Sequence, residues 1–470
     1  MTQANTARKG LLRTVRLAAY TLVCAAISAT VVRAGEITYK CEGLEEKSPY
    51  TAFGVKMYQG YDGWFFRQGD FETLFELPPE TLELLSRVNS ALHYKGVHLT
   101  LLPMLPRAIA GRAYVPNDGM LSDIIYDPEL AAQQFDALLE SVQQRGIDSL
   151  NINAVLNNNP SFDKGAYYFK RDIHWTPEGA RLVADAVATH INALQNGPAN
   201  VTEFETSMES GAQLHRANFN AILNELCQSK IPSEEVRTYD TKQKVGSLDD
   251  LLGESDDDNP DAVHVVGSSY TDDITVYHFD GFLRQYLKQN VGGFSISGGG
   301  VDQSIYAWAQ NTNGLGKSPK FLVWEFADFV DLRKLTASMN VSLVPAIIGD
   351  CADNLKITEQ AFREDSVVSL DLPPLAGKAA EHYLRYEFDN RALTNFQLTY
   401  AYDDGSLKTV SFENPSRVSG LDKLYQALPA GTGAAPIHVD LKMSVGAKSA
   451  GSVKLCRYPD GVFQGMETSN

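Results

Sequence analysis

A short apolar run ends in a cluster of small residues over Ala262-Val263-His264-Val265-Val266-Gly267-Ser268-Ser269-Tyr270. The run predicts a buried strand over residues 262–266, and the glycine predicts a tight turn at its end. Such a turn exposes the hydroxyl of Ser269 and directs its backbone N–H to the same point, where it can serve as an oxyanion donor. Triplets of this kind also occur in ordinary loops, so the segment alone predicts only an exposed serine after a strand.

Similar strands recur along the chain and are separated by amphipathic stretches. We expect strands at residues 97–102, 147–156, 294–297 and 321–326, and helices at residues 129–144, 177–194 and 276–289. Thr176 can cap the second of these helices, and Pro177 suits its first turn. Strands that alternate with helices predict an α/β fold, in which a parallel sheet is flanked by helices. Ligands of such sheets bind beyond the carboxyl ends of the strands.

The character of the chain changes after about residue 352. Apolar and polar residues alternate with a period of two over residues 384–388, 396–402 and 437–443. This alternation predicts an antiparallel β-sandwich or barrel. We therefore expect an α/β domain over residues 35–350 and a C-terminal all-β sandwich domain over residues 351–470.

Residues 197–260 interrupt the rhythm of the α/β domain. A helix is expected at residues 219–227. The acidic segment at residues 249–261 is expected to be a solvated loop, because its carboxylates lack the regular spacing of a calcium site.

The first 34 residues resemble a secretory signal peptide. Basic residues precede an apolar run over residues 17–32, and Val32-Arg33-Ala34 suits cleavage near Ala34. A retained membrane anchor is the alternative, but the run is short and contains Thr and Ser. Cleavage removes five basic residues and no acidic ones, which takes the formal net charge from −17 to about −22. Such a charge argues against nucleic acid as a partner.

Four cysteines remain after cleavage: Cys41, Cys227, Cys351 and Cys456. In an exported chain they predict two disulfides, for which three pairings are possible. The pairing Cys41–Cys227 and Cys351–Cys456 respects the expected domain boundary. A zinc site is the alternative, although the chain has no Cys-x-x-Cys motif or paired histidines to support it.

A carboxylate and an imidazole stand two residues apart in Asp172-Ile173-His174. In an extended segment, side chains two apart point the same way. Asp172 can then hold the Nδ1 proton of His174 and leave Nε2 free to accept a proton from Ser269. The alternative is an aspartate at a helix entry beside a surface histidine. Together with Ser269 the pair would form a complete set for acyl transfer through serine.

A glycine run, Gly298-Gly299-Gly300, follows the expected strand at residues 294–297 and precedes a helix that begins near Asp302. Its backbone can approach a ligand closely, and Gly299 is a candidate for the second oxyanion donor. A phosphate cradle is the alternative, but no Lys-Ser/Thr follows and the spacing of a Rossmann motif is absent. We therefore expect no cofactor and no metal.

With these segments in view, the chain resembles the SGNH hydrolase-like domain of alginate O-acetyltransferases. The resemblance rests on residues 60–66 (GYDGWFF), 168–180 (YFKRDIHWTPEGA), 267–270 (GSSY) and 322–326 (LVWEF). Of these, the segment around Asp172 and His174 is the most specific. The two expected disulfides and a C-terminal β-domain also fit that family, in which this domain is a carbohydrate-binding module.

The resemblance implies that Ser269 is the nucleophile, His174 the base and Asp172 its orienting carboxylate. Tyr270 and Arg181 are candidates for supporting the site. Two features depart from the SGNH pattern: the serine block reads Gly-Ser-Ser where Gly-Asp-Ser is usual, and no asparagine suits the oxyanion position. In the C-terminal module, three basic residues are candidates for binding the carboxylates of a polymer: Arg385, Arg391 and Lys408. For each of them taken singly, plain surface charge is the favoured alternative.

Three functions remain open at this point. The first is a periplasmic O-acetyltransferase that acts on an anionic, alginate-like exopolysaccharide, with acetyl groups relayed, as the resemblance implies, from a membrane O-acyltransferase and other periplasmic proteins of polymer synthesis. The second is a secreted carbohydrate esterase, in which water takes the place of the sugar hydroxyl. The third is a non-catalytic scaffold that holds the polymer during secretion.

Overall fold

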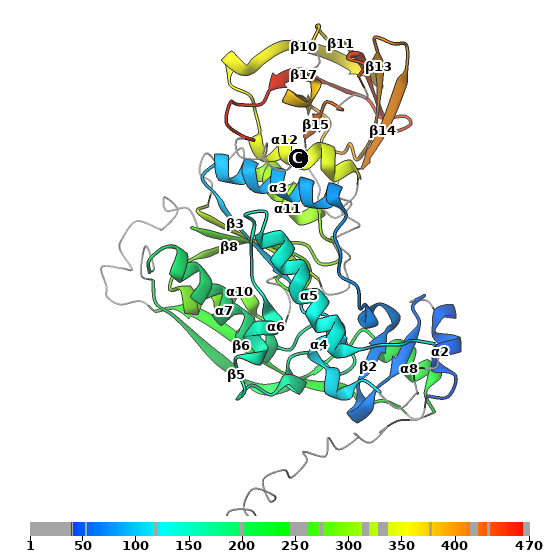
Figure 1. The fold of residues 1–470 in the computed structure, drawn as a ribbon, viewed down its shortest axis with the longest axis vertical. Coiled ribbons are helices and arrows are strands. Elements are labelled where there is room, and N and C mark those ends of the chain that lie inside the picture. Colours follow the sequence, from blue (N-terminus) through cyan, green and yellow to red (C-terminus); the bar gives the residue numbers. More distant parts are fainter. Residues whose placement is uncertain are drawn as a thin grey trace, which may run out of the picture.

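The structure is a computed structural model of the 470-residue chain (Figure 1). It describes residues 39, 41–51, 54–116, 121, 123–197, 202–228, 230–244, 262–272, 276–312, 319–327, 337–375, 378–413, 422–429 and 433–463. The expected signal peptide and the acidic segment at 249–261 lie outside these residues. Within them, no helix has both the length and the apolar character needed to cross a bilayer.

A five-stranded parallel sheet forms the centre of the N-terminal part, in the order β4-β3-β9-β7-β8. Its strands are β3 (His98–Pro103), β4 (Asp148–Ser149), β7 (Val263–Gly267), β8 (Val291–Ser295) and β9 (Phe321–Phe326). All six residues of β9 are buried, as expected of a central strand covered on both faces. The predicted α/β class, with a parallel sheet flanked by helices, is therefore confirmed.

Two layers of helices cover the sheet, and alternate strand residues face each layer. Leu322 and Trp324 join the apolar cluster made with α3 (Pro79–Tyr94), α11 (Gln303–Thr312) and α12 (Ala337–Ile348). Phe321 and Val323 join the cluster on the other face. The helices of that cluster are α4 (Arg107–Ala110), α5 (Pro128–Gln143), α6 (Ile152–Asn157), α7 (Pro177–Leu194) and α10 (Phe279–Leu287).

Most of the predicted elements are present, with shifted ends. The bounds of α7 and β9 are those expected. The strand predicted at residues 147–156 is wrong in its second half, where the chain forms α6. There Asn151 Oδ1 accepts a hydrogen bond of 2.9 Å from the N–H of Ala154 and caps the helix, a local contact that an apolar run does not reveal.

An antiparallel hairpin of β5 (Phe204–His215) and β6 (Glu234–Gln243) was not predicted. It flanks α7 and α10 at the edge of the α/β part (Figure 1). Because β5 is largely exposed and carries few apolar residues, it lacks the alternation by which a half-buried strand is recognised. Between its strands lies α8 (Asn220–Leu226), within the region where a helix was expected.

A small N-terminal layer of α2 (Leu44–Lys47), β1 (Met57–Gln59) and β2 (Phe65–Arg67) packs against α8. The disulfide Cys41–Cys227 joins α8 to this layer. A second disulfide, Cys351–Cys456, joins the chain after α12 to the last strand. The pairing that respects the domain boundary is confirmed, and all four cysteines are disulfide-bonded rather than available to zinc.

Residues after 355 form two four-stranded antiparallel sheets. One has the order β10-β17-β12-β15, with strands Lys356–Asp365, Ser449–Arg457, His382–Phe388 and Lys423–Ala427. The other has the order β11-β16-β13-β14, with strands Val367–Asp371, Pro436–Met443, Asn395–Tyr402 and Leu407–Glu413. Side chains of this part continue the apolar cluster of α3, α11 and α12, so the C-terminal module rests on the helical layer of the α/β part (Figure 1).

Candidate active site

The turn after β7 places Ser269 at the carboxyl end of the sheet. Gly267 is required there, because a Cβ at this position would overlap the side chains of Glu325 and Thr271. The next residue, Ser268, is buried, whereas Ser269 remains partly accessible. The strand end and the glycine therefore present one hydroxyl at the surface, as the sequence predicts.

Glu325, near the end of β9, fixes this turn from beneath. Its buried carboxylate accepts hydrogen bonds from the N–H of Ser268 (2.6 Å), from the hydroxyl of Ser268 (2.9 Å) and from the hydroxyl of Thr271 (3.2 Å). The departure from Gly-Asp-Ser has a physical reason here. An aspartate in place of Ser268 would bring a second carboxylate against Glu325 in a buried position, and the two charges would repel.

The segment that carries His174 is held at both ends. Tyr168 and Trp175 form an isolated antiparallel bridge. Thr176 then caps α7, accepting a hydrogen bond of 3.1 Å from the N–H of Gly179, and donates its own proton to the carbonyl of Ala166. Because α7 begins directly after this cap, His174 has a fixed position at the entry of the helix.

Ser269, His174 and Asp172 meet in one line of hydrogen bonds. The Nε2 atom of His174 lies 2.6 Å from Oγ of Ser269, and its Nδ1 atom lies 2.6 Å from Oδ1 of Asp172. Asp172 is fully buried and His174 is 7% exposed. The two segments that the sequence singles out therefore converge, although they stand 95 residues apart.

Two further groups bind the other oxygen of Asp172. Oδ2 accepts hydrogen bonds from Nε2 of His215 (3.0 Å) and from the N–H of Asn218 (2.7 Å). Burial acts to raise the pKa of Asp172, but the hydrogen bonds from His174 and His215 outweigh it and hold the pKa below its ordinary value. Sequence reasoning missed His215, because it lies at the end of the unpredicted strand β5.

Aromatic rings enclose the imidazole of His174. The ring of Tyr277 stacks on it, with centroids 4.9 Å apart and planes at 24°, and the ring of Tyr270 lies 5.0 Å away. The hydroxyl of Tyr270 donates to the carbonyl of Ile173, which ties the nucleophile turn to the histidine segment. Burial raises the pKa of Tyr277, and the charge of Asp172 raises it further, so its hydroxyl stays neutral at physiological pH.

This arrangement can abstract a proton from Ser269. The carboxylate of Asp172 fixes the tautomer of His174 with the proton on Nδ1, so Nε2 carries a lone pair toward the serine hydroxyl. Distances of 2.6 Å put both pairs within hydrogen-bond reach, at its short end. The geometry is that of a nucleophile, a base and an orienting group in acyl transfer.

Two of the predicted supporting residues do not reach the site. The N–H of Gly299 donates a hydrogen bond of 2.9 Å to the carbonyl of Ile296, so it closes a turn and is not directed toward an oxyanion. Arg181 lies on the exposed side of α7, where Nε donates to the hydroxyl of Tyr286 (2.9 Å) and the guanidinium lies over the ring of Phe282. Arg181 therefore joins α7 to α10 and is not part of the triad's hydrogen bonds.

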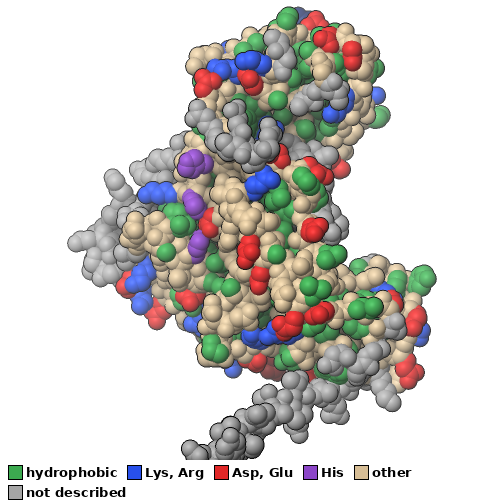
Figure 2. All heavy atoms as spheres, in the orientation of Figure 1, with side chains coloured by type: hydrophobic (Ala, Val, Ile, Leu, Met, Phe, Trp, Pro, Cys, Tyr) green, Lys and Arg blue, Asp and Glu red, His purple; other side chains and the backbone are tan. Residues whose placement is uncertain are grey.

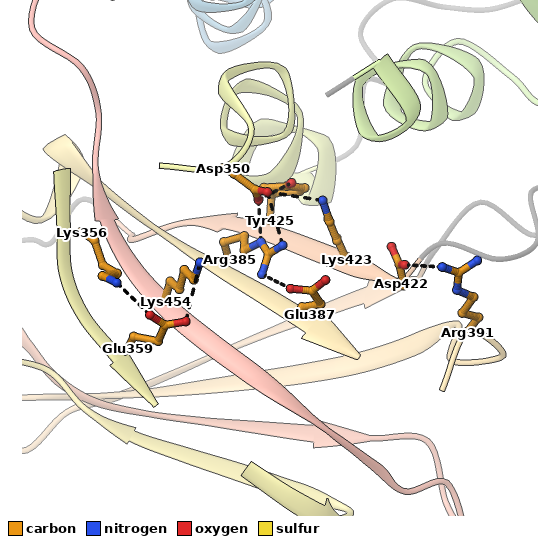
Figure 3. A network of polar contacts seen from close by, with 10 residues as sticks. All are labelled: Asp350, Lys356, Glu359, Arg385, Glu387, Arg391, Asp422, Lys423, Tyr425 and Lys454. Atoms are coloured by element: carbon orange, nitrogen blue, oxygen red, sulfur yellow. Dashed lines mark hydrogen bonds and ion pairs between the residues drawn. The ribbon is translucent and has the colours of Figure 1, made fainter. Parts of the chain in front are cut away.

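Arg385 was predicted to bind polymer carboxylates, and the structure contradicts this (Figure 3). Its guanidinium is buried against the start of the module, where Nε donates to Asp350 (2.6 Å) and Nη1 to Glu387. Tyr425 and Lys423 also contact Asp350. Since its charge is already paired, Arg385 joins the module to the end of α12.

The other two basic residues named as candidates for polymer binding remain accessible. Arg391 has an exposed side chain that pairs with Asp422 at 3.0 Å, and Lys408 is exposed on β14. Across the residues that the structure covers, no cluster of three His, Cys, Asp or Glu has the arrangement of a metal site.

Known proteins match this chain over most of the α/β part. Residues 57–328 match the family described as "SGNH hydrolase-like domain, acetyltransferase AlgX". The alginate biosynthesis protein AlgX of Pseudomonas aeruginosa is 28% identical over 288 residues, which cover 61% of this chain and 58% of that protein. The probable alginate O-acetylase AlgJ of the same organism is 25% identical over 284 residues, covering 57% of this chain and 68% of AlgJ.

The fold itself is matched over a greater length. The solved structure of Pseudomonas aeruginosa AlgX superimposes with a TM-score of 0.73 at 22% identity and covers 89% of this chain and all of that one. By sequence the chain matches a little over half the length of curated AlgX. Because the family match spans more than half of the chain, the protein belongs to the family of SGNH hydrolase-like domains typified by the acetyltransferase AlgX.

Proposed function

We propose that this protein is a periplasmic O-acetyltransferase that transfers acetyl groups to hydroxyls of an alginate-like exopolysaccharide. The observation that carries the proposal is the continuous line from Asp172 through His174 to Ser269, with both hydrogen bonds at 2.6 Å. The names of the relatives support the substrate class, since they are called alginate biosynthesis protein and probable alginate O-acetylase.

In the first half of the reaction, Nε2 of His174 takes the proton of Ser269, and Oγ attacks the carbonyl carbon of an acetyl donor. The carbonyl oxygen becomes negative, and the backbone N–H of Ser269 is the proposed donor that stabilises it. One such donor lowers the barrier by about 3 kcal/mol. The bond to the leaving group then breaks, the leaving group takes the proton from His174, and acetyl-serine remains.

In the second half, a sugar hydroxyl replaces the leaving group. His174 takes its proton, the sugar oxygen attacks the acetyl carbon, and Oγ of Ser269 leaves with the proton returned by His174. If water enters instead, the same steps give an esterase. Which of the two activities occurs therefore depends on whether a sugar hydroxyl or water reaches the acetyl group on Ser269.

The polymer is proposed to extend from the serine toward the C-terminal module. This module is proposed to act as a carbohydrate-binding module. Arg391 and Lys408 are its accessible candidates for binding uronate carboxylates. Figure 2 shows basic and acidic side chains interspersed on the visible face, so such contacts would be local rather than part of one basic surface. The acetyl donor is proposed to reach the protein from a membrane O-acyltransferase and other periplasmic proteins of polymer synthesis.

The test is mass spectrometry of the purified protein after exposure to a small acetyl ester, with and without polymannuronate. We expect an acetyl group on Ser269 in the absence of polymer, and acetylated polymer with free Ser269 in its presence. The variant Ser269→Ala should show neither product while it still binds the polymer.

Each other outcome contradicts part of the proposal. Release of acetate at the same rate with and without polymer, with no acetylated polymer, would identify an esterase. Polymer binding without acetyl-serine or turnover would leave only the role of a scaffold. Acetylation that persists in Ser269→Ala would exclude Ser269 as the nucleophile.

A further inference from the structure

His215 occupies a position beside the triad that its residue type alone does not explain. It is the last residue of β5, it is 8% exposed, and its ring stacks on Phe169 with centroids 4.0 Å apart and planes at 14°. Its Nε2 atom lies 3.0 Å from Oδ2 of Asp172. A buried histidine that faces a buried carboxylate must donate through that nitrogen, because an ionised carboxylate only accepts.

The carboxylate of Asp172 therefore has four donors, two on each oxygen. Oδ1 receives Nδ1–H and the backbone N–H of His174, and Oδ2 receives His215 and the backbone N–H of Asn218. Of these four donors, two are backbone N–H groups and one is the catalytic histidine itself. His215 is the one side chain among them that donates to Oδ2. Its removal would leave that oxygen with a single donor in a site closed to solvent.

We propose that His215 is a positioning residue of the acyl-transfer site, which fixes the plane and the charge of Asp172 and through it the tautomer of His174. This inference rests on the proposed function of the triad. The sequence of contacts is His215 to Asp172 to His174 to Ser269, so the unpredicted hairpin helps to set the reactivity of the serine.

The charged and titratable groups around His215 fit this role. Across the hairpin its partner is Glu234, whose carboxylate is already bound by the backbone N–H groups of Lys170 (2.9 Å) and Arg171 (3.0 Å). Tyr277 contacts both histidine rings: it lies edge-on to His215, with centroids 6.3 Å apart, and stacks on His174. Asp172 is therefore the carboxylate to which His215 donates.

Two substitutions separate donation from packing. His215→Phe keeps a ring against Phe169 but removes the donor, whereas His215→Gln can place an amide N–H close to the position of Nε2. We expect His215→Phe to lower kcat for a small acetyl ester by about 10- to 100-fold, the effect of losing one hydrogen bond to a charged group, with little change in KM. His215→Gln should restore kcat to within about threefold of the parent protein.

A spectroscopic measurement tests the same contact without turnover. The Nδ1 proton of His174, held between two heavy atoms 2.6 Å apart, should give a far-downfield proton NMR signal. The signal should persist in Ser269→Ala and His215→Gln, and it should weaken or move in His215→Phe. Thermal unfolding of each variant shows whether the fold is intact.

The outcomes distinguish this inference from the proposed function. If His215→Phe keeps both kcat and the signal, or if His215→Gln loses as much as His215→Phe, the positioning role is wrong. If the parent protein shows no acetyl-serine but the signal responds to His215→Phe as expected, the proposed function fails while the contact through Asp172 stands.

Discussion

Two clusters, each of one aspartate and two histidines, lie at opposite edges of the parallel sheet, where the strands end and where they begin. At the carboxyl edge, Asp172 binds His174 and His215. At the other edge, Asp148 in β4 binds His98 at the start of β3 (3.1 Å) and His190 in α7 (2.6 Å). The residue types are the same, yet only the first cluster leads to a serine.

Burial and the third partner make the difference. Asp172 is fully buried, whereas the side chains of Asp148, His190 and His98 are 21%, 28% and 41% exposed. Both histidines at Asp148 use Nε2 for the carboxylate, and Oδ2 also accepts from the hydroxyl of Thr100 (2.7 Å). His174 instead binds its carboxylate with Nδ1, which leaves Nε2 for Ser269. A histidine–aspartate pair becomes reactive only when the second nitrogen faces a nucleophile.

The largest expected effect is on catalysis. Asp172→Asn would present an amide to Nδ1 of His174 and favour the wrong tautomer, so kcat should fall by about 10⁴-fold. Asp148→Asn is the matched control, because it changes the same atoms at the opposite edge, and its kcat should stay within about twofold. Steady-state kinetics with a small acetyl ester measures both. Similar losses in the two variants would refute the distinction between the clusters.

The second-largest expected effect is on stability, when a charge is introduced next to Glu325 beneath the turn of Ser269. Ser268→Asp would bring a carboxylate against Glu325 and should lower the free energy of unfolding by about 3 kcal/mol at neutral pH. The introduced carboxylate would resist ionisation in the fold, so the loss should diminish as the pH falls toward 4. Denaturant unfolding at both pH values measures this, with Ser268→Asn as the uncharged control. An unchanged stability would show that Glu325 does not determine the departure from Gly-Asp-Ser.

At the cluster of Asp148, which is partly exposed, the expected effect on stability is smaller and depends on pH. The hydrogen bond that His190 donates to Asp148 raises the pKa of His190. Burial acts to raise the pKa of Asp148, but the hydrogen bonds that Asp148 accepts hold this pKa below its ordinary value. The contribution of His190 is thus fully present below about pH 6.5 and lost as the pH rises through its folded pKa, and that of Asp148 is lost in acid. Asp148→Asn should cost about 1 kcal/mol at pH 6 and less at pH 9. A cost that rises with pH would contradict this assignment.

The smallest effect separates the two histidines of that cluster. His190→Gln should reduce the melting temperature at pH 6 more than His98→Gln, since His190 is more buried and lies closer to Asp148. For His98→Gln we expect less than about 0.5 kcal/mol, as for other exposed pairs. Thermal melts of the two variants decide between them, and the reverse order would show that distance and burial do not rank these contacts.

The sequence predicts the regular elements where the pattern is strong. The helix at residues 177–194 combines a cap, a proline and an apolar stripe, and its bounds are reproduced. The strand at 321–326 is a nearly continuous apolar run, and of the three possible cysteine pairings the structure contains the one that respects the expected domain boundary. The prediction was weaker where one short polar contact decided the structure, as for Asn151 at the start of α6.

The site was only partly predictable, for a related reason. Asp172 and His174 stand two residues apart, so their contact is local, and the turn of Ser269 follows from Gly267. By contrast, the groups that donate to Glu325 lie 54 and 57 residues away from it, and Asp350, which pairs with Arg385, lies 35 residues away. No pattern within a single segment indicates whether such a charge is already paired.

By itself, the sequence determined the α/β class, the separate β-rich C-terminal region, the two disulfides, and the three residues with the chemistry for acyl transfer. Only the tertiary structure decided that Ser269 meets His174, that His215 holds Asp172 from an unpredicted hairpin, and that Arg385 is buried at the base of the module. Periodicity and turn chemistry act over a few residues and can be seen along the chain. The burial and pairing of charges depend on which distant segments the packed cores bring together.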